Sequence, residues 1–148
     1  SRFLTFRKIR STIFVNPLVF ERSAPDAGIR AILAHELAHV LFYRQQNRLS
    51  LIKLAGLIHG GVNARFERRT DLIAIERGYG PGLIEYREWL YQNVPASKVS
   101  AKRRDYFSTD EIRLILTASA TDSKLIGRLK RKVPQNIREL QEQIQKTP

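Results

Sequence analysis

The sequence HELAH, at residues 35–39, holds the residues of this chain best suited to chemistry. Residues four apart lie one turn above each other on a helix, so His35 and His39 can direct their imidazoles at one metal ion. Zinc binds neutral imidazole, and three protein ligands with an open fourth position make a catalytic zinc site. Glu36 lies about 100° further round the helix, toward an adjoining solvent pocket. There it could take the proton of a zinc-activated water that attacks a carbonyl group.

The alternative for this motif is a pair of helix histidines that are merely packed or solvated. Background residue usage produces the HExxH spacing by chance in on the order of a few chains per thousand of this length. Here the motif also falls within an amphipathic helical pattern that follows a helix-start sequence. We therefore favour the metal site.

A third zinc ligand must come from further along the chain, and the residues leave three candidates open. Glu67 and Asp71 lie one turn apart in ERRTD, and His59 lies before them. Asp71 is also placed to hydrogen-bond a ligating histidine. The alternative for both acids is a solvated helix face that pairs with neighbouring arginines at small energetic value. Because the apolar residues 72–75 follow, Asp71 lies near core positions, where an unpaired carboxylate would be costly.

Two predicted elements precede the site. Residues 12–20, TIFVNPLVF, are rich in β-branched and aromatic types and predict a strand. Pro17 cannot donate to a β-ladder, so we expect either an edge strand or a strand that ends near Asn16. Apolar residues at three- and four-residue steps predict a helix over residues 27–44, entered through the SAPD sequence at residues 23–26.

The remainder of the chain is predicted to be mostly helical. One helix over residues 63–77 would carry Glu67 and end at Gly78. The polar and basic residues 95–106 predict a surface loop, and the SxxE pattern at residues 108–111 predicts a capped helix start. Three further helices are expected over residues 83–92, 124–132 and from Pro134 onward, whereas residues 45–61 are ambiguous.

HELAH followed by a helix with the ExxxD spacing of Glu67 and Asp71 resembles the gluzincin metallopeptidases, particularly their minimal single-domain members. The resemblance covers roughly residues 12–80 of this chain. It implies peptide-bond hydrolysis, with residues 13–17 as the strand that borders the cleft and pairs with an extended peptide substrate. The implied roles are His35, His39 and Glu67 as zinc ligands, Glu36 as general base, and Asp71 as hydrogen-bond partner of a ligating histidine.

The family also uses a tyrosine or histidine to stabilise the oxyanion. Tyr106, Tyr79 and His59 are the candidates in this chain, and we assign Tyr106 to the catalytic set. The alternative for each tyrosine is an ordinary half-buried aromatic residue.

The expected fold is α+β: a small mixed sheet with its edge strand beside the HExxH helix, then a mostly helical C-terminal half. Residues 1–118 would form the zincin-like metallopeptidase domain. Residues 119–148 would form a basic helical extension that packs on this domain or trails from it.

Composition limits the other possibilities. The absence of cysteine excludes disulfides, Cys-ligated zinc and a thiol nucleophile. The net charge of +12 is spread along the chain, with a local cluster at residues 124–132 that could meet an anionic surface. No aromatic residues interleave with this cluster, so nucleic-acid binding is not favoured. The chain opens on Ser1 rather than Met, so we expect that a segment was removed, and an export signal or anchor could have been lost with it.

Two rival functions stay open at this point. The first is a basic, DNA-associated protease of the SprT-like kind, which resembles this chain if His59 is the third ligand. The second is a non-catalytic binding module stabilised by zinc, in which the metal would have four protein ligands. Oligomeric state and compartment are not predicted.

Overall fold

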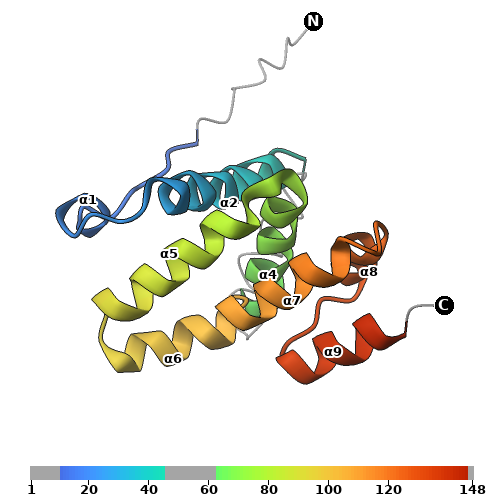
Figure 1. Cartoon of the computed structure of the whole chain (residues 1–148). Coiled ribbons are helices and arrows are strands. Elements are labelled where there is room, and N and C mark those ends of the chain that lie inside the picture. Colours follow the sequence, from blue (N-terminus) through green and yellow to red (C-terminus); the bar gives the residue numbers. More distant parts are fainter. Residues whose placement is uncertain (1–10, 46–62, 147–148) are drawn as a thin grey trace, which may run out of the picture.

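The computed structural model describes residues 11–45 and 63–146. Every regular element in these ranges is a helix (Figure 1). The helices are α1 (Leu18–Glu21), α2 (Asp26–Gln45), α4 (Asn63–Ala74), the π-helical turn η1 (Ile75–Tyr79), α5 (Gly80–Asn93), α6 (Ala96–Asp105), α7 (Thr109–Ser119), α8 (Leu125–Arg131) and α9 (Ile137–Gln145). None of the described helices is long and apolar enough to cross a bilayer.

The predicted α+β fold with a mixed sheet is wrong, because residues 11–45 and 63–146 contain no strand. Residues 11–16 have no regular structure, and the second half of the predicted strand is the short helix α1. The Asn16 side chain accepts a hydrogen bond from the backbone N–H of Leu18, and Pro17 stands at the N-cap with helical φ/ψ. This local helix start overrides the β-propensity of the run. Residues 12–20 also do not form a buried apolar surface, since the Phe14 side chain is 92% exposed.

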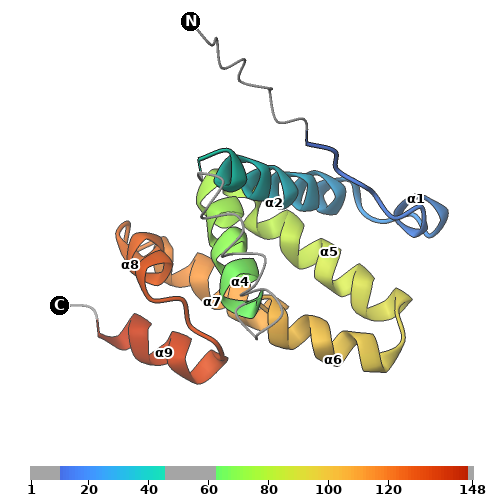
Figure 2. The same cartoon turned by 180° about the vertical axis from the view of Figure 1, so that it is seen from behind.

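The HELAH helix α2 packs closely against α5, and α4 also packs against α2 (Figures 1 and 2). Small residues make the α2–α5 approach possible. A Cβ on Gly82 would lie 2.4 Å from the carbonyl oxygen of Ala27 and 2.9 Å from the Cβ of Ala31. A Cβ on Gly28 would come within 3.1 Å of Tyr86. The contact therefore sets the position of α2, which carries both histidines.

The chain reverses between α4 and α5 at a sharp kink. Gly78 has φ +90°, a backbone conformation that residues with a side chain rarely adopt. The predicted end of the Glu67 helix at Gly78 is thus confirmed, although the structure continues at once into α5, with Pro81 in its first turn.

One apolar core joins the middle and the C-terminal part of the chain. Leu125, Leu129 and Leu140 are buried in the same cluster as Leu72 and Ile112. The helices predicted around residues 124–132 and beyond Pro134 are confirmed as α8 and α9. Within the described residues, the segment that follows residue 118 therefore packs into the core that supports α4.

The surface loop predicted over residues 95–106 is wrong, because this segment is the helix α6. Its backbone is secured from outside the segment: the guanidinium of Arg68 donates to the carbonyl oxygens of Arg103 and Arg104, each at 3.3 Å. These carbonyls lie in the last turn, where they have no partner within the helix. Arg68 also donates to Glu111 at 2.8 Å, and Glu111 completes the predicted capping box with Ser108. The sequence of the segment alone does not show this support.

Candidate metal centre

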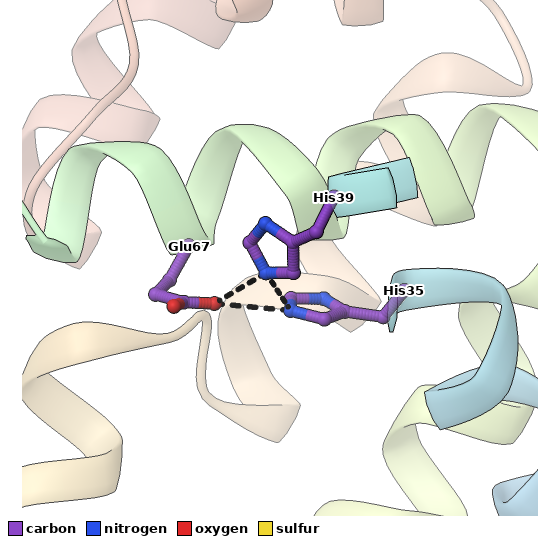
Figure 3. Close-up of side chains that lie close together, drawn as sticks. All are labelled: His35, His39 and Glu67. Atoms are coloured by element: carbon purple, nitrogen blue, oxygen red, sulfur yellow. Dashed lines mark hydrogen bonds and ion pairs between the residues drawn. The ribbon is translucent and has the colours of Figure 1, made fainter. Parts of the chain in front are cut away.

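His35 and His39 on α2 meet Glu67 on α4 (Figure 3). The Nε2 atoms of the two histidines lie 3.0 Å apart, and each lies 3.0 Å from Oε2 of Glu67. The one-turn spacing of the histidines places both rings on the face of α2 that meets α4. His35 is fully buried and His39 nearly so, while Glu67 is partly buried. Three of the predicted site residues are thus brought together by two helices.

The donor atoms fit a small metal ion with nitrogen and oxygen ligands. Ligands at about 2.0–2.1 Å from a tetrahedral zinc are about 3.3–3.4 Å apart. The observed 3.0 Å separations need only a small expansion to reach that value. A cation between these atoms would also be stabilised, because the carboxylate of Glu67 and an unprotonated imidazole nitrogen both direct lone pairs at the same point. The group could therefore hold a metal ion.

Asp71 fixes the orientation of His35 from the side opposite the donor atoms. Nδ1 of His35 lies 2.8 Å from Oδ1 of Asp71, and an ionised carboxylate can only accept, so Nδ1 carries the proton. In the neutral ring, Nε2 is then left with its lone pair facing Glu67 and His39. The structure thus places Asp71 as a partner of His35 and not among the three converging donor atoms.

Asp71 is in turn held by two groups that the sequence did not indicate. Arg87 on α5 donates from Nη2 to both carboxylate oxygens, at 3.1 and 3.2 Å, and the backbone N–H of Phe107 donates to Oδ2. Burial raises the pKa of Asp71, but Arg87 and the hydrogen bond from His35 outweigh burial and lower the pKa. Asp71 is therefore an ionised carboxylate in a fully buried position.

His39 has a weaker partner of the same kind. The hydroxyl of Thr70 donates to the carbonyl of Phe66 at 2.9 Å and lies 3.4 Å from Nδ1 of His39. With its proton engaged by Phe66, this hydroxyl accepts from Nδ1–H and leaves Nε2 of His39 free for the centre. The ring of Phe66 also packs against His39, with 4.8 Å between ring centroids.

In the metal-free protein, His35 and Glu67 stabilise each other as a charged pair. Burial lowers the pKa of His35, but hydrogen bonds to Asp71 and Glu67 outweigh burial and raise the pKa to about 9. Burial raises the pKa of Glu67, but hydrogen bonds from His35 and His39 outweigh burial and lower the pKa to about 2. A proton thus provides the positive charge that the converging lone pairs require.

A cleft of about 330 Å³ is lined by the remaining predicted catalytic residues. None of the three donor residues lines it, but Tyr106 in its wall lies beside His35. Glu36 and Tyr106 both line it, together with Arg87 and residues 13–16. The Tyr106 ring lies 5.8 Å from the His35 ring, and the Arg87 guanidinium lies 4.7 Å from the Tyr106 ring centroid. Burial raises the pKa of Tyr106, so its hydroxyl keeps its proton. The segment predicted to border the cleft does so, but as irregular chain and not as a strand.

Of the other two oxyanion candidates, Tyr79 is not brought to this cleft. Tyr79 lies beyond Ala74 at the opposite end of α4 from Asn63 and is not among the residues that line the cleft. His59 lies outside the described residues. Thr70 and Arg87 are site residues that sequence reasoning missed. Thr70 could have been found, because it is one helical turn from Glu67, whereas no local pattern indicates Arg87.

Comparison with known proteins adds no relative. The chain matches no protein-family model, and searches of curated proteins and of solved structures found no similar protein.

Proposed function

We propose that this chain is a zinc-dependent metallopeptidase. The observation that carries the proposal is the convergence of His35 Nε2, His39 Nε2 and Glu67 Oε2, at 3.0 Å from one another, beside a cleft lined by Glu36. Two imidazoles and a carboxylate form one of the ligand sets that catalytic zinc uses. The Asp71–His35 contact gives the tautomer that such a ligand needs.

The fourth coordination position supports a catalytic site over a structural one. Structural zinc sites are closed by four protein ligands, whereas catalytic sites keep a position for water or substrate. Within residues 11–45 and 63–146, the group that could hold an ion consists of His35, His39 and Glu67. Because Glu67 completes this group, a third histidine is not required, and we prefer the peptidase to the SprT-like alternative.

Zinc, when bound at this group, supplies Lewis acidity that polarises a carbonyl group and makes a water molecule more acidic. Glu36 makes no hydrogen bond or ion pair with another described residue, so its carboxylate is free to accept a proton in the cleft. Tyr106 keeps its proton and can donate a hydrogen bond to the negative charge that develops on the carbonyl oxygen. The two residues therefore divide the roles of base and oxyanion donor.

The first experiment compares Glu36→Gln with the wild-type protein. Both are stripped with a chelator, reloaded with one equivalent of zinc, and incubated with a peptide mixture that is followed by mass spectrometry. We expect about one zinc per chain in both proteins, and cleavage lowered about 10²- to 10⁴-fold in the variant through loss of the base. Glu85→Gln, an exposed carboxylate on α5 that does not line the cleft, is the matched control.

Three results would contradict the proposal: a wild-type protein that binds no zinc, a zinc-loaded wild-type protein that cleaves no peptide, or a Glu36→Gln protein with full activity. Tyr106→Phe adds a test of the second role, with an expected loss of about 10²- to 10³-fold in kcat if its hydroxyl supports the oxyanion.

A further inference from the structure

The wall of the cleft that is formed by α6 carries two exposed lysines. Lys98 and Lys102 are one helical turn apart, so they lie on the same face of α6, and both line the cleft. Neither pairs with a carboxylate among the described residues. Nζ of Lys102 lies over the Tyr106 ring, 4.8 Å from its centroid. Both lysines therefore present unneutralised charge to the cleft, and the charge of Lys102 lies close to the residue that we assign to the oxyanion.

Charges on the other walls do not cancel them. Among the described residues that line the cleft, Glu36 is the one carboxylate, and Arg87 is already bound to buried Asp71. The remaining lining is largely apolar, with side chains such as Ile32 and Leu90. The cleft thus combines apolar residues with a cationic wall. In the part of the chain that the structure describes, no second acid lines it to bind a basic substrate.

We propose that this cleft selects substrates with a carboxylate close to the bond that is cut, and that Lys98 and Lys102 bind this carboxylate. This inference rests on the proposed peptidase function and adds the substrate class. The carboxylate can be an Asp or Glu side chain or the C-terminus of the peptide. Its position near the scissile bond follows from the contact of Lys102 with Tyr106, whose ring lies 5.8 Å from that of His35.

The selectivity is tested first by cleavage. A peptide library from an unrelated proteome is incubated with zinc-loaded wild type, and the cut bonds are identified by mass spectrometry. We expect Asp and Glu to be enriched within three residues of the cut bonds, or cuts to gather near free C-termini. The best substrates are then synthesised with Gln or Asn in place of the acid, and with amidated C-termini, to distinguish the two sources of carboxylate.

The lysines are tested by charge reversal. In the Lys98→Glu/Lys102→Glu variant, we expect a fall in the kcat/KM for an acidic peptide relative to that for its Gln or Asn counterpart. The fall should be about 3- to 25-fold, because each exposed lysine–carboxylate pair changes the ratio by a few-fold. Lys124→Glu/Lys132→Glu changes the net charge equally at exposed positions on the ends of α8, which do not line the cleft, and should keep the wild-type ratio. All four lysines are exposed, and circular dichroism verifies that both variants fold.

A binding measurement separates this inference from the proposed function. Fluorescein-labelled Leu-Ala-Glu-Ala-Leu and its Gln counterpart, each with a free or an amidated C-terminus, are titrated with Glu36→Gln protein and followed by anisotropy. Tighter binding of a carboxylate-bearing peptide that is lost with Lys98→Glu/Lys102→Glu supports the cationic wall, even if no peptide is cleaved. Cleavage without acidic preference, or a preference that survives charge reversal, overturns the inference and leaves the peptidase intact. Equal binding of all the peptides, together with no cleavage, overturns both.

Discussion

The two histidines of the centre are held by both of their ring nitrogens, but not equally well. His35 Nδ1 donates to an ionised, buried carboxylate at 2.8 Å, whereas His39 Nδ1 reaches a neutral hydroxyl at 3.4 Å. A hydrogen bond to a charged acceptor is about twice as strong as one between neutral groups, and the longer distance weakens the second further. Asp71 should therefore contribute more to metal affinity than Thr70.

Asp71→Asn and Thr70→Val test this difference. We expect Asp71→Asn to weaken zinc binding about 10- to 100-fold, because the amide no longer enforces the Nδ1–H tautomer of His35. Thr70→Val should weaken zinc binding by less than about tenfold. Competition with a chromogenic zinc chelator measures both affinities.

Asp71→Asn also removes the charge that compensates buried Arg87, so its folding is verified by circular dichroism before the titration. Wild-type affinity in Asp71→Asn, or a larger loss in Thr70→Val, would show that these contacts do not position the ligands as described.

How much of the site was predictable depends on how local each contact is in the chain. The pair His35 and His39, and the ExxxD spacing of Glu67 and Asp71, are each set by one helical turn, so the sequence indicates them directly. The spacing alone does not show that the two helices meet with these faces together; the gluzincin resemblance implies it, and the structure shows it. Arg87 illustrates the limit, because an arginine that closes a buried network from a third helix has no local pattern.

At the scale of the elements, the position of the ligands depends on how closely α2 can approach α5. The α2–α5 contact is built from Gly28, Ala31 and Gly82, whose small size lets the two backbones come together. A larger side chain here would displace α2 as a unit, and His35 lies one turn beyond Ala31. Packing remote from the donor atoms is thus part of the site.

Gly82→Ala should destabilise the protein, whereas Gly127→Ala should not. The added methyl group at residue 82 meets the Ala27 carbonyl oxygen at 2.4 Å, and an overpacked core costs about 1–3 kcal/mol. At residue 127, within α8, the nearest atom is 3.9 Å away, and alanine is the better helix former by about 1 kcal/mol. Urea unfolding of the two variants measures the free energies, and equal effects would contradict the close-packing account.

The elements themselves were predicted unevenly. Helices with a clear start or stop were found from sequence, as with the capping box at Ser108 and the end at Gly78. The strand over residues 12–20 failed because a turn at Asn16, whose side chain accepts from the backbone N–H of Leu18, leads into α1 in spite of the β-propensity. Helix α6 was missed because Arg68, 35 or more residues away in sequence, binds the carbonyl oxygens of its last turn. The first error gave β-propensity more weight than a local Asn-Pro turn signal, whereas the second arises from a contact that is distant in sequence.

On the scale of the whole molecule, the centre joins the HELAH helix to the main core. The ligands come from α2 and α4, and α4 packs on α8, whose Leu125 and Leu129 belong to the core cluster that also includes Leu72. A metal ion at the centre would therefore be bound by the folded chain and lost on unfolding, because the helices would separate. Binding of this kind stabilises the fold by mass action.

Zinc should raise the thermal stability of the whole protein. Substitutions at two positions of α2, residues 36 and 39, should differ in whether they keep this effect. With free zinc at 100 times its Kd, the gain is about 2.7 kcal/mol, or about 5–10 °C in Tm for a chain of this size. His39→Ala should abolish the shift because it removes a ligand, whereas Glu36→Gln should retain it because the base does not bind the metal. Differential scanning calorimetry measures each Tm with and without zinc, and magnesium is the control, because that ion prefers oxygen ligands. A shift that persists in His39→Ala, or disappears in Glu36→Gln, would mean that the ion binds elsewhere and that the roles assigned along α2 are incorrect.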